Sequence, residues 1–189
     1  MKYDILLCGV GGQGVLSIAS VIAQAAVEEG LQVKQSEVHG MSQRGGAVEA
    51  HLRLSDIAIY SDLIPQGQAS LILSMEPLEC LRYIPYLSPE GMIVTAGEPV
   101  RNIPSYPEID TVLSEIHGFP HHRIIPALEL ARKAGSPRAS NMVLVGAASQ
   151  FLPLSVDTLK RVIERRFKRK GDAMVQMNLH AFDLGRNIS

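Results

Sequence analysis

Apolar and polar residues recur with two different periods along the chain, which predicts alternating strands and helices at its start. Residues 3–10 form a short apolar run, which is typical of a strand buried in a parallel sheet. After a glycine-rich turn, apolar residues recur at helical spacing as far as Gly30, a residue suited to end a helix. Residues 31–36 are the next predicted strand, so this part of the chain is expected to fold as a β–α–β unit.

The middle of the chain is expected to contribute further strands, one of them amphipathic. Strict alternation over residues 48–54 predicts a strand with one face that is solvent-exposed or functional. That face carries Glu49, His51 and Arg53. Other predicted elements are strands at residues 69–75, 92–96 and 124–125 and a short helix after Pro77. Neither period is present in the glycine-rich residues 37–46 or the proline-rich residues 99–107, which are expected to be irregular.

Helical spacing dominates the last third of the chain. Helices are predicted over residues 127–134, 139–151, 155–170 and 172–184. Gly135 and Pro153 are suited to end the first two, and Ser155 to cap the third. No repeat or linker interrupts the chain, so we expect residues 1–189 to form one α/β domain. The expected architecture is a Rossmann-like three-layer α/β/α sandwich with a mostly parallel sheet and a helical C-terminal third.

The composition is that of an ordinary soluble globular protein. Hydrophobic residues make up 46% of the 189 residues, charged residues make up 20%, and the net charge is −1. A charge this small provides no field that would attract nucleic acid or an anionic membrane. The first residues lack the features of a signal peptide, and no apolar run approaches the ~20 residues that a membrane helix needs. We therefore expect a cytoplasmic location, with neither nucleic acid nor a membrane as partner.

The cysteines and histidines do not form the spacing of a metal or cluster site. Cys8 and Cys80 lie in apolar segments and are expected to be buried thiols. An iron–sulfur cluster normally takes four thiolates, so these two cannot hold one in this chain alone. No metal is expected at the adjacent His121 and His122 either, because no carboxylate–histidine spacing accompanies them.

The glycine turn at residues 9–14 satisfies the dinucleotide-binding pattern G-x-G-x-x-G. It follows a predicted strand, opens a predicted helix, and is accompanied by Glu37 near the end of the second strand. Three roles are open: NAD or FAD binding, close packing of strand against helix, and contact with an anionic substrate or a partner's cofactor. We favour the third role. Its candidate contact residues are Gly11, Gly12, Gln13 and Gly14.

The glycine-hinged residues 37–46 are a second candidate site, because they hold several polar side chains close together. The candidates for contact with substrate, coenzyme A or a partner's cofactor are His39, Ser42, Gln43 and Arg44. Arg44 could form a bidentate pair with a carboxylate or a phosphate. The alternatives are an ion pair at a subunit interface for Arg44 and a purely structural role for His39.

Together with residues 48–53, these two segments resemble the small (beta) subunit of indolepyruvate:ferredoxin oxidoreductase. The same domain is the gamma subunit, or an internal domain, of pyruvate and 2-oxoglutarate ferredoxin oxidoreductases. Those relatives usually show a different sequence before Arg-Gly-Gly, so His-Gly-Met-Ser-Gln at residues 39–43 favours the indolepyruvate branch. Further similarity lies in residues 76–80, 140–146 and 178–182, so the resemblance covers essentially the whole chain. Thr95-Ala96 depart from an expected asparagine, which leaves the identity of the 2-oxoacid open.

The resemblance implies a complex that oxidatively decarboxylates a 2-oxoacid on thiamine diphosphate. The acyl group passes to coenzyme A as co-substrate, and electrons leave through iron–sulfur clusters to ferredoxin. In this family the thiamine diphosphate and the clusters belong to a large, alpha-type partner subunit, so this chain alone is expected to bind no cofactor and hold no catalytic residue. The sequence agrees, because the thiamine diphosphate motif begins Gly-Asp-Gly and Gly171-Asp172 is followed by alanine. We expect the isolated chain to be inactive and to expose an apolar surface through which it self-associates.

Other functions stay open at this point. The chain could be the gamma subunit of a pyruvate or 2-oxoglutarate ferredoxin oxidoreductase. From other classes, it could be a stand-alone NAD- or FAD-binding Rossmann module, or an assembly scaffold without any residue at the active site. The basic residues 160–170 are expected to form a solvated helix face, with docking to an acidic ferredoxin or to coenzyme A phosphates as the alternatives.

Overall fold

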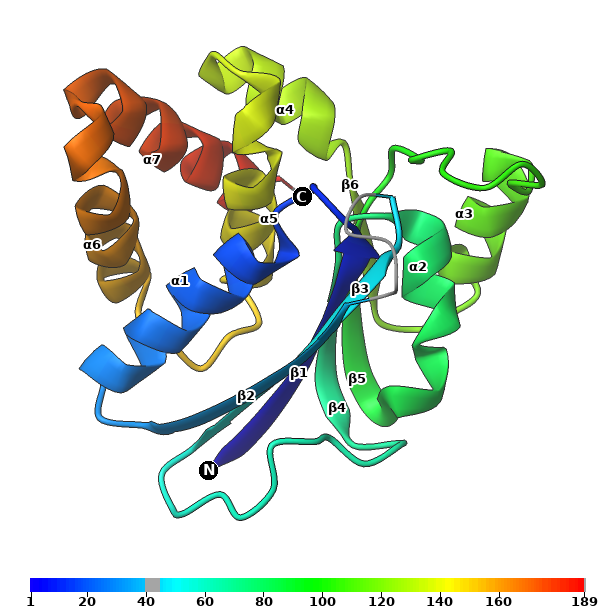
Figure 1. Ribbon diagram of the computed structural model, residues 1–189, viewed down its shortest axis with the longest axis horizontal. Coiled ribbons are helices and arrows are strands. Elements are labelled where there is room, and N and C mark those ends of the chain that lie inside the picture. Colours follow the sequence, from blue (N-terminus) through cyan, green and yellow to red (C-terminus); the bar gives the residue numbers. More distant parts are fainter. Residues whose placement is uncertain (40–44, 189) are drawn as a thin grey trace.

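A six-stranded mixed sheet lies at the centre of the computed structural model, which describes residues 1–39 and 45–188 (Figure 1). The strands are β1 (Lys2–Val10), β2 (Gln32–His39), β3 (Ala47–Ser55), β4 (Ala69–Ser74), β5 (Leu87–Ala96) and β6 (His122–Ile125). The helices are α1 (Val15–Glu28), α2 (Pro77–Arg82), α3 (Ile109–His117), α4 (Ala127–Ala134), α5 (Ser140–Ala148), α6 (Val156–Phe167) and α7 (Asp172–Arg186). Short 3₁₀ turns are η1 (Ile84–Tyr86), η2 (Pro137–Ala139) and η3 (Lys168–Lys170).

The strand order is β2-β3-β1-β4-β5-β6. Strands β1, β4, β5 and β6 pair in parallel, whereas β3 pairs antiparallel with both β1 and β2. The expectation of a mostly parallel sheet is therefore confirmed. The predicted β–α–β unit needs a correction, because β3 is inserted between its two strands. A hydrophobic period shows that a segment is a strand, but it does not select the neighbour with which that strand pairs.

Helices cover both faces of the sheet, which confirms the three-layer α/β/α sandwich. Figure 1 shows α1, α5, α6 and α7 on one side and α2 and α3 on the other. Alternate residues of β1 belong to different cores, as the period of a strand requires. Ile5 and Leu7 pack with α1 and the C-terminal helices, whereas Leu6 and Cys8 pack with α2 and α3.

Several boundaries differ from those that the sequence predicts. Strand β2 continues to His39 instead of ending at Ser36, because its main chain pairs residue by residue with β3. Helix α3 lies in a stretch for which no helix was predicted, although Ile109, Val112, Leu113 and Ile116 recur at helical spacing and all pack into the core beside α2. Helices α5 and α6 end at Ala148 and Phe167, short of the predicted ends. Ser155 precedes α6 but makes no side-chain capping bond.

The polar face of β3 is not solvent-exposed, contrary to one form of the prediction. His51 and Arg53 are only 2% and 8% exposed. The main chain of residues 61–64 binds both side chains: Ile64 N–H donates to His51 Nδ1 at 3.0 Å, and Arg53 Nη1 donates to Leu63 O at 2.9 Å. These polar groups therefore anchor the chain between β3 and β4.

Among the residues that the structure describes, no helix combines the length and the apolar character that crossing a membrane requires.

Candidate functional site

The glycine turn lies at the carboxyl end of β1, where the chain enters α1. Gly12 and Gly14 adopt left-handed backbone conformations, with φ of 102° and 90°, which other residues rarely tolerate. A Cβ on Gly9 would lie 2.9 Å from both Gln13 Oε1 and Met75 Cβ. Backbone geometry and close packing therefore account for these three glycines. Ligands of open α/β sheets bind outside the carboxyl ends of parallel strands, which is where this turn lies.

The turn is joined to the other candidate segment through the main chain. Gly11 N–H donates to Gly46 O at 2.8 Å, and Gly45 N–H donates to Gly11 O at 3.5 Å. His39 ends β2 in the same row of the sheet, since its backbone pairs with Val48 and Val48 pairs with Gly9. The structure thus brings together the glycine turn and both ends of the predicted loop.

Gln13 turns its side chain into the turn. Its Oε1 accepts from Val10 N–H at 2.7 Å, and its Nε2 donates to Met75 O at 2.9 Å. The amide therefore ties the end of β1 to the end of β4. A ligand contact by Gln13 stays a prediction, and the same is true of Gly11, Gly12, Gly14 and His39. Ser42, Gln43 and Arg44 lie outside the described residues, so their predicted contacts also stay predictions.

The segment between β5 and α3 crosses this edge and is held by Glu76, which is 1% exposed. Glu76 Oε1 accepts from Val100 N–H at 3.3 Å and from the Tyr106 hydroxyl. Burial and this hydrogen bond raise the pKa of Tyr106, so the hydroxyl stays a donor. Asn102 Nδ2 then donates to Gly45 O at 2.7 Å. The segment therefore buttresses the end of the candidate loop.

Four residues at this edge were not predicted as site residues: Glu76, Asn102, Tyr106 and Asn141. Asn141 lies against the glycine turn, since its Nδ2 would be 3.1 Å from a Cβ on Gly14. The sequence offered one signal for two of them. Glu76 and Asn141 fall within the later segments of family resemblance, whereas Asn102 and Tyr106 lie in the proline-rich segment without any period.

Two positive groups lie along α1. The helix begins at the glycine turn with no acidic residue in its first turn, so the partial positive charge of its N-terminus is not neutralised there by a side chain of that turn. Arg166 extends from α6 and donates to Ser17 Oγ at 3.3 Å and to Ser20 Oγ at 3.2 Å. Both of these partners are neutral hydroxyls and leave the charge of Arg166 in place, so an anion is favoured beside the start of α1.

Residues 4–188 match the family described as pyruvate ferredoxin/flavodoxin oxidoreductase. The chain belongs to this family.

Full-length relatives support the assignment. Indolepyruvate oxidoreductase subunit IorB of Pyrococcus horikoshii is 38% identical, and the match covers 97% of this chain and 94% of that protein. IorB of Archaeoglobus fulgidus is 37% identical, with 99% and 95% covered. The 2-oxoglutarate synthase subunit KorC of Archaeoglobus fulgidus is 27% identical, with 100% and 90% covered. The family resemblance found in the sequence is thus confirmed.

Solved structures confirm the fold. The gamma subunit of a keto/oxoacid ferredoxin oxidoreductase from Geobacter sulfurreducens matches with a TM-score of 0.71 and 23% identity, covering 97% of this chain and 96% of that one. A 2-oxoglutarate:ferredoxin oxidoreductase from Magnetococcus marinus matches with a TM-score of 0.78 and 24% identity, covering 98% of this chain and 30% of that one.

Sheet topology in this oxidoreductase family member argues against the dinucleotide alternative. The acidic residue of that pattern belongs on the strand beside β1. Here Glu37 lies on β2 and pairs with Ala50, so the whole of β3 separates it from β1. The glycine pattern of a dinucleotide site is present, but its acidic residue lies one strand too far from β1.

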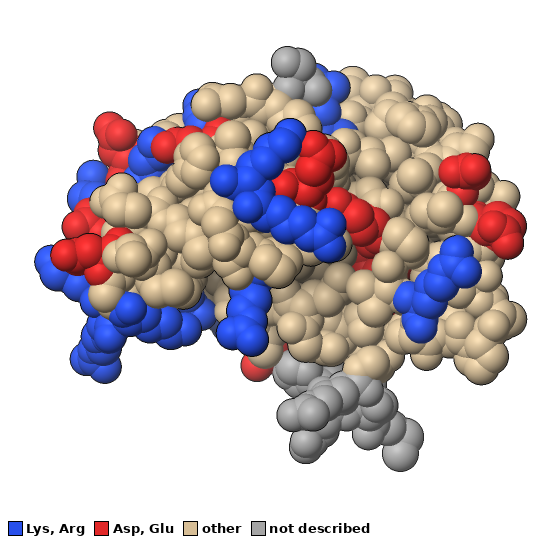
Figure 2. Space-filling view, turned by 90° about the horizontal axis from the view of Figure 1, so that it is seen from above, with Lys and Arg blue, Asp and Glu red and all other residues tan. Residues whose placement is uncertain are grey.

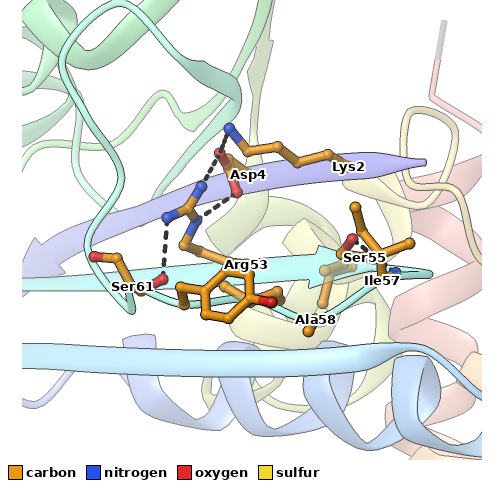
Figure 3. Close-up of a pocket in the computed structure, with 10 residues that line it drawn as sticks. Lys2, Asp4, Arg53, Ser55, Ile57, Ala58 and Ser61 are labelled. Atoms are coloured by element: carbon orange, nitrogen blue, oxygen red, sulfur yellow. Dashed lines mark hydrogen bonds and ion pairs between the residues drawn. The ribbon is translucent and has the colours of Figure 1, made fainter.

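A cavity of about 300 Å³ lies near the amino end of β1, at the opposite edge of the sheet from the glycine turn (Figure 3). Arg53 and Lys2 both point toward Asp4 there. Arg53 Nε and Nη2 donate to the two carboxylate oxygens of Asp4 at 2.9 and 3.1 Å, and Lys2 Nζ lies 3.1 Å from Oδ2. Arg53 also donates to Ser61 O at 3.0 Å. Because these polar groups are engaged with one another, we assign them a structural role.

The other candidates for metal or thiol chemistry are occupied or inert. His122 lies 2.7 Å from Phe119 O through Nδ1 and 2.9 Å from His117 Nδ1 through Nε2. Within the described ranges, no group of three or more histidine, cysteine, aspartate or glutamate side chains is placed to hold a metal ion. Cys8 and Cys80 are buried as predicted, and burial raises the pKa of Cys80 to about 12 and that of Cys8 well above its usual range. Thiols with such pKa values are inert near neutral pH.

Proposed function

We propose that this chain is the small subunit of an indolepyruvate:ferredoxin oxidoreductase and works only in complex with a large subunit. One observation carries the proposal: the match to IorB subunits at 35–38% identity over nearly the full length of both proteins. By comparison, the 2-oxoglutarate synthase subunit KorC of Archaeoglobus fulgidus and two ketoisovalerate oxidoreductase subunits VorA are 25–27% identical. The complex oxidatively decarboxylates the 2-oxoacid, releases CO₂, forms an acyl-CoA and reduces ferredoxin.

The redox cofactors belong to the large subunit in this proposal. The described residues of this chain do not fit an iron–sulfur cluster, because both thiols are buried and protonated near neutral pH. They do not fit thiamine diphosphate either, since Gly171-Asp172-Ala173 leads directly into α7. When bound in the partner, thiamine diphosphate supplies the carbanion chemistry and the clusters carry the electrons.

The role of this chain is to bind and orient an anion at the carboxyl edge of its sheet. The α1 N-terminus and Arg166 make that edge attractive to a phosphate or carboxylate. In the sequence Arg44 directly precedes Gly45 and Gly46, whose main chain bonds to Gly11 at this same edge. Coenzyme A fits this chemistry, and the Magnetococcus marinus enzyme was solved with coenzyme A and succinyl-CoA bound. Such a complex works in the cytoplasm, where reduced ferredoxin is used.

Anaerobic reconstitution tests the proposal. The small and large subunits are assayed separately and together with indolepyruvate, pyruvate and 2-oxoglutarate, while ferredoxin reduction and acyl-CoA formation are followed. Only the mixture should be active, with the highest kcat/KM for indolepyruvate. A preference for pyruvate or 2-oxoglutarate would move the chain to another branch of the family. Stoichiometric binding of NAD or FAD by the isolated chain would reject the proposal.

A further inference from the structure

A small cavity of about 160 Å³ opens beside the glycine turn. It lies where β4, β5 and β6 end and where α4 and α5 begin. Its lining includes Gln13, Met75, Glu98, Val100, Leu128 and Ser140. Figure 2 looks down on this edge of the sheet, where acidic and basic side chains lie side by side over the middle of the face.

Only one of the two carboxylate oxygens of Glu98, which lines this cavity, accepts a hydrogen bond from the described residues. Its Oε1 accepts from Leu128 N–H at 2.8 Å, in the first turn of α4. Its Oε2 is buried and has no hydrogen-bond partner in the part of the chain that the structure describes. Buried polar atoms in native proteins nearly always have a partner, and a buried carboxylate oxygen without a donor is destabilising. A donor is therefore expected to come from another molecule.

The lining specifies the chemistry of that donor. Glu98 carries the one formal charge among the described lining residues, and Met75, Val100 and Leu128 contribute apolar wall. A group that fits must have an apolar stem and a donating, positively charged end, since hydrogen bonds to a carboxylate are strongest from a cation. Lysine and arginine side chains have this form.

The size of the cavity specifies the kind of molecule. Small-molecule sites usually enclose roughly 300–1,000 Å³. A volume of about 160 Å³ is below that range and suits one long side chain. The cavity also lies on the edge that is proposed to face the active site of the complex.

We propose that this cavity receives a lysine or arginine side chain of the large subunit, whose cation pairs with Glu98. The proposal rests on the partner that the proposed function assigns, but not on the substrate. The pair fixes the carboxyl edge of the sheet, including the glycine turn, against the partner. It also provides the donor that Glu98 Oε2 lacks in the isolated subunit.

Glu98→Gln tests the pairing, because the amide keeps an oxygen for Leu128 N–H and loses the charge. We expect Kd for the large subunit, measured by biolayer interferometry under anaerobic conditions, to rise at least about 30-fold. Thermal stability of the isolated small subunit should be unchanged or higher, since an unpaired buried charge is removed. The matched control is Glu90→Gln at the other end of β5, where the side chain is 92% exposed. It should leave both measurements unchanged.

Three outcomes would overturn the proposal. They are a wild-type Kd for the Glu98→Gln variant, no measurable binding between the wild-type subunits, and a clear loss of stability of the isolated variant. The last would mean that Glu98 is already paired within its own chain. Because binding is measured without a 2-oxoacid, a complex that assembles through Glu98 but does not oxidise indolepyruvate would refute the proposed function and leave this pairing standing.

Discussion

Individual residues in this protein divide into those that hold the fold and those that are left to meet another molecule. Arg53 belongs to the first group, because its guanidinium is bound by Asp4 and by two main-chain carbonyls. Glu98 belongs to the second, since one of its carboxylate oxygens has no partner among the described residues. The fully hydrogen-bonded Arg53 therefore has a structural role at one end of the sheet. The partly unpaired Glu98, at the opposite end, is a candidate for binding another molecule.

Arg53→Met should destabilise the small subunit by about 3–5 kcal/mol, because it leaves the buried Asp4 carboxylate without its main partner. The measurement is urea unfolding followed by circular dichroism. Lys2→Met is the matched control, since it removes the other cation from the same carboxylate. Lys2 has a side chain that is 52% exposed, so its loss should cost less than about 1 kcal/mol. Equal losses from the two variants would contradict the structural assignment of Arg53.

Arg44→Ala should lower kcat/KM of the reconstituted complex roughly 30-fold or more, because a charge-assisted pair with an anion is lost. Arg44→Lys should recover little of the activity if the contact is bidentate, since an ammonium cannot reproduce the planar fork. Assembly is measured alongside activity. Normal assembly with lost activity supports an active-site role, lost assembly indicates an interface role, and wild-type behaviour in both assays rejects both.

The buried thiols predict a dependence of stability on alkaline pH. Burial raises the pKa of Cys80 from about 9 to about 12, so the folded state keeps this thiol neutral while the unfolded chain ionises it. The raised pKa means that the stabilisation is complete below pH 9 and is lost as the pH rises toward 12. Cys80→Ala should therefore show a shallower decline of the free energy of unfolding above pH 9, by up to about 1.4 kcal/mol per pH unit. Parallel declines in wild type and variant would refute the buried neutral thiol.

At the scale of elements, the C-terminal helices depend on an unusually close contact between α5 and α7. A Cβ on Gly146 would lie 2.0 Å from Phe182 O, and one on Gly185 would lie 1.9 Å from Val143 O. Residues Met142–Ala148 of α5 are all buried, so this helix is enclosed between the sheet and α7. The two glycines are what allow the third layer to form.

Gly185→Ala should therefore destabilise the subunit by about 3 kcal/mol or more, since backbone must move to relieve the clash. Thermal unfolding of the purified variant measures the effect. Gly118→Ala at the end of α3 is the control, because its Cβ would meet only the last turn of its own helix, at 3.1 Å from Glu115 O. A change at Gly185 no larger than that at Gly118 would show that α5 and α7 are not packed this closely.

At the scale of the whole molecule, large apolar side chains are exposed on one surface segment, which is unfavourable unless a partner covers them. Ile57, Tyr60 and Leu63 are 71%, 94% and 51% exposed, and all three lie between β3 and β4. Basic side chains gather elsewhere, at the end of the molecule formed by α6 and η3 (Figure 2). The segment between β3 and β4 therefore exposes three large apolar side chains, and the expected self-association through an apolar surface stays a prediction.

We expect the isolated subunit to self-associate with increasing concentration and the double variant Ile57→Ser, Leu63→Ser to remain monomeric longer. Sedimentation velocity over a range of concentrations measures both. Val27→Ser on α1 is the control, since it removes a 61% exposed side chain from a different surface. If the wild-type chain is monomeric at every concentration, the expected self-association through these apolar side chains is wrong.

The sequence by itself determined most of the elements and the family of this protein. Local sequence patterns were enough to predict the first elements. They are the apolar run of β1, the helical period of α1 and the glycines of the turn between them. The family resemblance lies in short contiguous motifs, which can be recognised directly in the linear sequence. Both kinds of information are local, so they can be inferred without coordinates.

Only the tertiary structure decided which elements are neighbours. The insertion of β3 between β1 and β2 follows from main-chain pairing, which side-chain periods do not encode, and it moved Glu37 away from the glycine turn. The polar face of β3 became buried because residues 61–64 satisfy it, and Glu98 became a candidate because its second oxygen stayed without a partner among the described residues. Hydrogen-bond satisfaction joins residues that are far apart in the chain, and it exists only once the chain is folded.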